Sequence, residues 1–252
     1  MTGKHADLCV TFANEKALET AGSLGYESIG LACEFRNSES FRKFAKEALP
    51  TSAAGINILT CAIITENVAE NAKKALEISD IVIAEPKSEE ACRQASESYE
   101  VDAIMSPEKY VENDMTDYKS SGLDHVMMKY MAERNIAYAI RFSDILRSYG
   151  AKRIQLLGRI RQNITLAEKY KTPVIAVSGA ANEYEMRAPR EIASYLSFLG
   201  LRENAGKAVC ESPSAVIKKA QDRKSPEVIT EGVSVKSWGK QQNTPKRRHG
   251  WY

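Results

Sequence analysis

The chain has 252 residues, of which 43% are hydrophobic, and its formal net charge is +2. This length and apolar content fit one large α/β domain, and the small net charge argues against strong nucleic-acid binding through overall charge alone. No apolar run is long enough to cross a membrane, and the first residues lead into a strand pattern instead of a signal peptide, so we expect a cytoplasmic protein. Five cysteines without C-x-x-C spacing fit a reducing compartment.

Strand and helix patterns alternate along the first two hundred residues. Strands are predicted at 6–12, 26–35, 56–65, 80–84, 102–105, 136–142 and 174–177. Helices are predicted at 15–23, 41–49, 68–79, 89–99, 123–133 and 151–170, with Ser38 and Ser88 as N-caps of the second and fourth, followed by shorter helices from Pro189, Leu201 and Pro213.

This alternation predicts right-handed βαβ units and a parallel sheet. Seven strands in about 200 residues favour a TIM-barrel-like (β/α) barrel over an open sheet. We expect residues 1–223 to form this single α/β domain. Residues 224–252 contain both tryptophans and a basic cluster, and we expect them to form a flexible tail.

In such a barrel the functional residues lie at the C-terminal ends of the strands. Arg36 follows the second predicted strand, and Arg141 lies near the end of the sixth, where it could point into the barrel mouth. Arg141 could equally be held by Asp144 or by an acid from another strand.

Positive charge is concentrated in the second half of the chain. Residues 1–100 carry a net charge of −6, whereas residues 134–171 carry 9 basic and 2 acidic residues, a net charge of +7. Such a segment could bind phosphate groups locally.

The predicted helix at 151–170 supplies four of these cations. At about 100° per residue, Ile154, Leu157, Ile160, Ile164 and Ala167 form the expected inward stripe. Lys152 and Arg159 then share an exposed face and Arg161 flanks the stripe, whereas Arg153 falls within it and must reach outward or pair with a neighbouring element. A solvated charged face remains the alternative to RNA contact for each of them.

The seventh predicted strand ends at a glycine turn. Gly179 can adopt a positive φ, and such a turn can direct the amides of Ser178 and its neighbours towards an anion. Arg187 and Arg190 follow, on either side of Pro189 at a predicted helix start. The pattern predicts a phosphate site at this turn.

Motifs for catalysis are missing. The three histidines are scattered, and the chain has no P-loop, dinucleotide fingerprint, nucleophile elbow or H-E-x-x-H motif. Isolated carboxylates such as Glu34, Glu85 and Asp102 could still bind Mg²⁺, but no spacing pairs them.

Several short motifs, in this order, resemble the archaeal ribonuclease P protein component 3 family over roughly residues 6–220. They are Leu123-Asp124-His125-Val126, Gly150-Ala151-Lys152-Arg153, Ser178-Gly179-Ala180, Arg187-Ala188-Pro189-Arg190-Glu191 and Phe198-Leu199-Gly200-Leu201. The resemblance implies a barrel related to the polymerase-and-histidinol-phosphatase superfamily that lacks its metal-binding histidines.

It further implies a subunit of the ribonucleoprotein endonuclease that removes the 5′ leader of precursor tRNA. The RNA component would perform the hydrolysis with Mg²⁺, and the chain would bind no cofactor itself. Its expected partners are ribonuclease P RNA, precursor tRNA, a small α/β subunit and other ribonuclease P proteins. Two alternatives stay open from the residues alone: a metal-dependent phosphoesterase, and a small-molecule phosphate-binding barrel with a closed pocket at the Ser178-Gly179 turn.

Overall fold

The computed structural model describes residues 5–12, 15–48, 55–111, 120–225, 227–230 and 233–236. Within these ranges no helix is both long and apolar enough to cross a membrane. The predicted barrel is confirmed.

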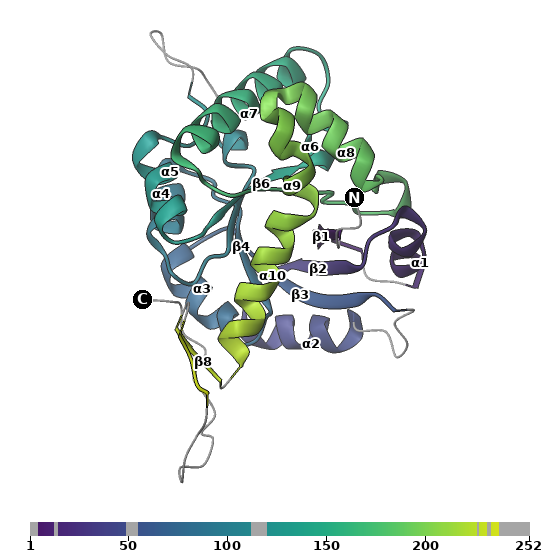
Figure 1. Ribbon diagram of the computed structural model, residues 1–252, viewed down its shortest axis with the longest axis vertical. Helices are drawn as coiled ribbons and strands as arrows, with labels where there is room; N and C mark the ends of the chain where they lie inside the picture. Colours follow the sequence, from purple (N-terminus) through teal and green to yellow (C-terminus); the bar gives the residue numbers. More distant parts are fainter. Residues whose placement is uncertain are drawn as a thin grey trace.

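Seven parallel strands form one sheet in the order β1 to β7 (Figure 1). A bridge between Val10 and Ala180 joins the first strand to the segment after the last, and the amide of Thr11 donates to the carbonyl of Ala180 at 2.8 Å. The sheet therefore curves into a nearly closed barrel. The strands are β1 (Ala6–Val10), β2 (Ser28–Glu34), β3 (Asn57–Ile64), β4 (Ile81–Ala84), β5 (Ala103–Met105), β6 (Ala137–Arg141) and β7 (Val174–Val177).

Strand residues are buried on both faces, as expected when helices cover a parallel sheet. One face packs inside the barrel, where Cys61, Ile83 and Ile175 meet. The other packs under the helices, where Ile64, Ile104 and the fully buried Tyr138 lie. Because both faces of each strand are buried, the strand sequences are continuous apolar runs, as the sequence showed.

Helices surround the strands in Figure 1. Their starts follow local capping chemistry: Ser88 Oγ accepts the amide of Ala91 at 3.1 Å, as predicted. The prediction of Ser38 as a cap is wrong, because the helix already begins there and Asn37 Oδ1 accepts the amide of Ser40. The helices are α1 (Glu15–Leu24), α2 (Ser38–Ala48), α3 (Val68–Leu76), α4 (Glu89–Glu97), α5 (His125–Glu133), α6 (Phe142–Leu146), α7 (Gly150–Tyr170), α8 (Pro189–Leu196), α9 (Ala205–Val209) and α10 (Glu211–Lys224), with short turns η1 (Pro107–Lys109), η2 (Glu183–Glu185), η3 (Ser197–Leu201) and η4 (Arg202–Asn204).

Helix α10 closes the N-terminal end of the barrel and runs diagonally across the strands in Figure 1. Val216, Ile217 and Ala220 join the core inside the barrel. Arg223 donates to both oxygens of Asp102, which precedes β5, at 2.7 and 2.8 Å. The C-terminal end of the barrel, where the strands terminate, is not covered by α10, and the candidate functional residues lie there.

Two elements were missed by the sequence patterns. The short helix α6 follows β6 directly, and a two-stranded antiparallel hairpin, β8 (Val228–Thr230) and β9 (Val233–Ser234), follows α10. The hairpin lies within the segment expected to be a flexible tail, so part of that segment has regular secondary structure. The remainder of the predicted tail, with Trp238, Trp251 and 246–248, lies outside the described residues.

Candidate nucleic-acid interface

An ion cluster fills the C-terminal mouth of the barrel. Arg141, at the end of β6, donates through Nε to Asp144 Oδ2 at 2.9 Å and through Nη1 to Glu85 Oε2 at 3.0 Å. The expectation that Arg141 could be held by acids is confirmed for both carboxylates. Since its side chain is only 10% exposed and doubly paired, it is a poor candidate for direct phosphate contact.

Lys109 and Ser106 complete this mouth cluster. The ammonium group of Lys109 lies 3.3 Å from Glu85 Oε1 and 3.3 Å from Asp144 Oδ1, and the hydroxyl of Ser106 donates to Asp144 Oδ2 at 2.6 Å. Two cations therefore balance two carboxylates. Among the described residues, no group of three or more potential ligands could hold a metal ion.

A pocket of about 570 Å³ opens beside the mouth cluster, against the first turns of α7. Four cationic residues and two acids line it. The two acids are bonded inside the protein, and Arg147 is paired with Glu185 at 2.6 Å. Lys152 is exposed at its rim, as predicted. The lining residues are Glu108, Lys109, Val111, Asp144, Arg147, Ser148, Lys152, Gln155, Leu156 and Arg159.

Arg159 does not lie where the sequence placed it. It is 7% exposed, and its guanidinium donates to the carbonyls of Val111 and Glu108. The predicted shared exposure of Lys152 and Arg159 is therefore wrong. Ile154, expected to face inward, is instead 73% exposed. The rest of the predicted stripe holds, since Ile160, Ile164 and Ala167 are buried. Apolar periodicity failed at the first turn and could not show that α7 also buries polar side chains against main-chain acceptors.

Below Arg159 lies a buried polar cluster. The amide of Asn163 donates to the carbonyl of Ser121 at 2.9 Å, and Tyr138 donates its hydroxyl to Glu108 Oε2 at 3.2 Å. Burial raises the pKa of Glu108 to about 7, because desolvation disfavours its charged form. This carboxyl is therefore only partly ionised at neutral pH.

The other two arginines of α7 face away from this pocket. Arg153 donates to the carbonyls of Ser148 and Leu146, so it pairs with the neighbouring end of α6 and the connection after it, one of the two options expected. Arg161 is exposed and donates to the carbonyl of Phe198 at 3.2 Å. The structure thus divides the four cations between two surfaces.

The glycine turn has the expected shape but not the expected function. Gly179 has a φ of 60° and lies so close to Arg141 that an added Cβ would be 2.3 Å from its side chain. However, the amides of Ser178, Gly179 and Ala180 donate to Asp7 Oδ1, the carbonyl of Cys9 and Ser178 Oγ. The predicted anion site is therefore wrong, because the first two amides join β7 to β1 and the third is bonded within the turn. A small phosphate would find no free amide among these three.

Asp7, which accepts from this turn, is itself buried. Desolvation raises its pKa to about 6, although the side-chain and amide hydrogen bonds from Ser178 and the amide of Cys9 oppose the shift. Asp7 therefore belongs to the closure of the barrel between β1 and β7.

The remaining predicted arginines do not converge on the pocket. Arg187 donates to the carbonyls of Tyr184 and Met186, so it stabilises the loop before α8. Arg190 is exposed on α8, and Arg36 is exposed and lies 3.4 Å from Glu34. RNA contact stays a prediction for Arg36 and Arg190.

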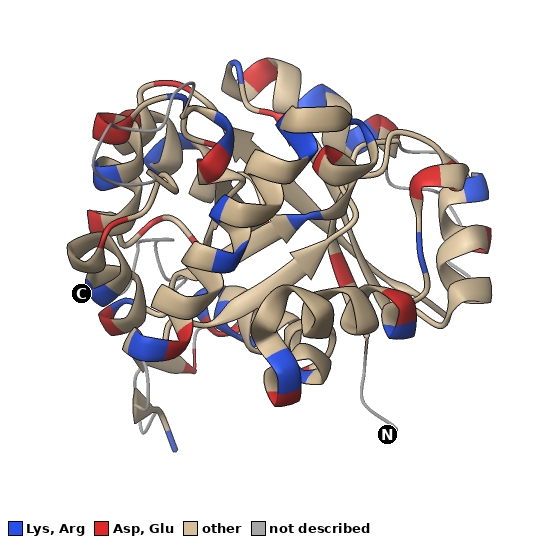
Figure 2. Cartoon of the chain, turned by 90° about the horizontal axis from the view of Figure 1, so that it is seen from above, with Lys and Arg blue, Asp and Glu red and all other residues tan. Residues whose placement is uncertain are grey.

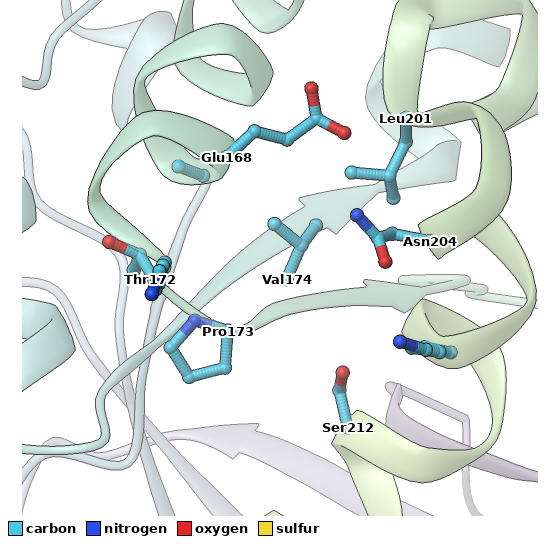
Figure 3. Close-up of a pocket in the computed structure, with 10 residues that line it drawn as sticks. Glu168, Thr172, Pro173, Val174, Leu201, Asn204 and Ser212 are labelled. Atoms are coloured by element: carbon cyan, nitrogen blue, oxygen red, sulfur yellow. The ribbon is translucent and has the colours of Figure 1, made fainter.

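A second, smaller pocket lies at the other end of the barrel, where β7 begins. It has a volume of about 260 Å³ and is lined by groups from α7, α9 and α10 (Figure 3). Asn204 and Ser212 point into it opposite Glu168 in that view. Glu168 and two lysines line it, a net charge of +1, compared with +2 for the mouth pocket.

Charges of both signs are interleaved over the helices in Figure 2, so positive charge is a local feature. The mouth pocket brings together the predicted Lys152 and Arg159 with Lys109 and Arg147, which sequence reasoning missed. Lys109 comes four residues after β5, a position at the strand's C-terminal end that could have been recognised. Arg147 had no such signal, because it follows the missed helix α6.

Comparisons with known proteins agree with this architecture. Residues 5–225 match the family described as RNase P subunit p30. The chain is 30% identical over 231 residues to ribonuclease P protein component 3 of Methanosarcina mazei, covering 88% of this chain and 89% of that protein. It is 26% identical over 220 residues to the same component of Methanococcus maripaludis strain C5, covering 87% of each.

A solved structure shares the fold. One chain of the cryo-EM structure of archaeal ribonuclease P with mature tRNA superposes with a TM-score of 0.78 at 20% identity, covering 94% of this chain and all of that chain. The family match spans nearly the whole described barrel, including the mouth cluster and α7. The chain belongs to the ribonuclease P subunit p30 family.

Proposed function

We propose that the chain is a noncatalytic subunit of ribonuclease P that binds and stabilises the catalytic RNA during removal of the 5′ leader of precursor tRNA. Family membership supports the assignment to ribonuclease P. The observation that carries the RNA-binding role is the mouth pocket, where cations outnumber acids and the acids are bonded internally.

A surplus of cations beside paired carboxylates suits a phosphate backbone. Lys152 is exposed and free to approach a phosphate group, and Lys109 is 44% exposed above the mouth cluster. Each phosphate that such a group neutralises releases counterions, which favours binding and makes it dependent on salt. The protein would thereby lower the repulsion between closely packed RNA helices.

The mouth cluster also supports a noncatalytic role. Glu85 and Asp144 are held by Arg141 and Lys109, so a metal ion would have to displace two cations to use these carboxylates. We assign the Mg²⁺-dependent hydrolysis to the RNA component. The partners in this proposal are ribonuclease P RNA, precursor tRNA, a small α/β subunit and other ribonuclease P proteins.

The test compares Lys152→Ala with Lys73→Ala, which removes an exposed lysine of α3 that does not line the mouth pocket. Binding of ribonuclease P RNA is measured across a salt series. We expect Lys152→Ala to lower the slope of log affinity against log salt by about 0.7 to 0.9, the share of one phosphate contact. Lys73→Ala should keep the wild-type slope.

Equal slopes for wild type and Lys152→Ala would contradict RNA contact at the mouth pocket. In a second assay the chain is freed of RNA by nuclease treatment and incubated with precursor tRNA and divalent metal. We expect no cleavage. Metal-dependent hydrolysis by the RNA-free chain would replace the proposal with a phosphoesterase.

A further inference from the structure

Two large aromatic side chains are exposed on the outer side of α7, each against an arginine. Tyr149 is 76% exposed, and the guanidinium carbon of Arg153 lies 5.2 Å from its ring centroid. Phe198 is 68% exposed, and the guanidinium carbon of Arg161 lies 5.1 Å from its ring centroid. These are cation–π contacts on an open surface.

A third aromatic ring, Tyr195, interacts electrostatically with Arg153 and Arg161. Tyr195 of α8 packs edge-on against Phe142, with ring centroids 5.4 Å apart. Burial raises the pKa of Tyr195, and the positive charges of Arg153 and Arg161 oppose that shift. We call Tyr149, Arg153, Tyr195, Arg161 and Phe198 the cation–aromatic row.

Main-chain oxygens, not carboxylates, orient the two guanidinium groups. Arg153 Nε donates to the carbonyl of Ser148 at 2.6 Å, and Arg161 donates to the carbonyl of Phe198 at 3.2 Å. Across the part of the chain that the structure describes, neither arginine forms an ion pair with an acid. Their planes are therefore fixed while their positive charge stays unneutralised.

We propose that the cation–aromatic row binds unpaired RNA nucleotides by stacking bases on the rings of Tyr149 and Phe198 and on the guanidinium planes beside them. Exposed aromatic rings and arginine planes are the surfaces on which proteins stack splayed bases. The inference rests on the proposed RNA-binding function, but it concerns bases on the outer side of α7, whereas the mouth pocket would contact phosphates.

Charge and spacing favour RNA over a protein occupant. The two arginines would meet phosphate oxygens, which supply the negative charge that the surrounding residues do not. Arg153 and Arg161 are eight residues apart on one helix, a rise of about 12 Å, so the two rings can serve different nucleotides of one extended strand. A partner protein would have to provide acids placed at both arginines.

The test uses the full-length chain and two fluorescein-labelled strands of equal length and charge: a short oligoadenylate, and an RNA backbone with abasic sites throughout. Fluorescence anisotropy measures both affinities. We expect wild type to prefer oligoadenylate, and Phe198→Leu to lower its affinity for that strand about tenfold, in line with the loss of one stacked base. Affinity for the abasic strand should not change.

Tyr184→Leu is the matched control, because Tyr184 is 80% exposed on η2 but lies outside the row. It should bind both strands as wild type does. An unchanged thermal unfolding midpoint verifies that Phe198→Leu folds. Because no charge is removed, the salt slope of this variant should equal that of wild type, unlike that of Lys152→Ala.

Equal affinity of wild type for the two strands, or no effect of Phe198→Leu, would overturn the inference and leave the mouth-pocket proposal standing. If Phe198→Leu instead abolished binding of a purified ribonuclease P protein while oligoadenylate binding persisted, the row would be a protein-docking surface and the inference would be wrong.

Discussion

The two ends of the barrel both pair acids with arginines, yet they differ in what covers them. At the N-terminal end α10 seals the opening, and Asp102 is fully buried against Arg223. At the mouth Arg141 holds Glu85 and Asp144, but Lys109 and the pocket beside it remain open to solvent. A closed ion pair contributes mainly to folding, whereas an open one leaves neighbouring cations available to a ligand.

The largest expected effect lies at the sealed end. Arg223→Met leaves the carboxylate of Asp102 buried with one amide hydrogen bond from Val82 and with the ammonium group of Lys219 at 3.8 Å. We expect the free energy of unfolding to fall by about 3–5 kcal/mol, measured by urea denaturation. Lys218→Ala, an exposed change on the same helix, should have almost no effect. A loss below about 1 kcal/mol would show that α10 does not depend on this pair.

A smaller effect is expected at Glu108, under the mouth pocket. The fold raises the pKa of Glu108 from 4.5 to about 7, so its protonated form adds to the free energy of unfolding. This contribution is fully present below pH 4.5 and is lost as pH rises through 7. Glu108→Gln removes this titration. Relative to wild type, the variant should gain about 3 kcal/mol of unfolding free energy between pH 4.5 and pH 8.

Urea denaturation at several pH values measures this difference. Asp7, whose pKa is raised to about 6, titrates in wild type and variant alike, so it cancels in the comparison. Glu203→Gln on the surface provides the control. A difference that does not change with pH would show that Glu108 is charged in the folded protein.

The mouth should tolerate the loss of its arginine better than the sealed end does. In Arg141→Gln, Asp144 keeps the hydroxyl of Ser106 and the ammonium of Lys109. We expect the unfolding free energy to fall by about 2 kcal/mol, less than for Arg223→Met, because a mobile cation and water can compensate. The same denaturation assay compares the two variants directly. A larger loss at Arg141 would reverse the contrast between the two ends.

Hydrophobic patterning and turn residues determined most of the fold. Two-sided burial produces continuous apolar runs, so the seven strands and their parallel order could be predicted, and Ser88 marked a helix start correctly. Helix α6 escaped because five residues are too short to show a period. The hairpin after α10 escaped because its strands are short and exposed.

The candidate site was only partly predictable, since sequence shows charge but not the partner of each charge. The excess of cations around α7 was visible, and Lys152 proved exposed. Only the tertiary structure decided that Arg159 is buried against main-chain carbonyls, that Arg141 is neutralised by Glu85 from another strand, and that the amides beside Gly179 bind β1. Each depends on residues far apart in the chain, which periodicity and local motifs cannot bring together.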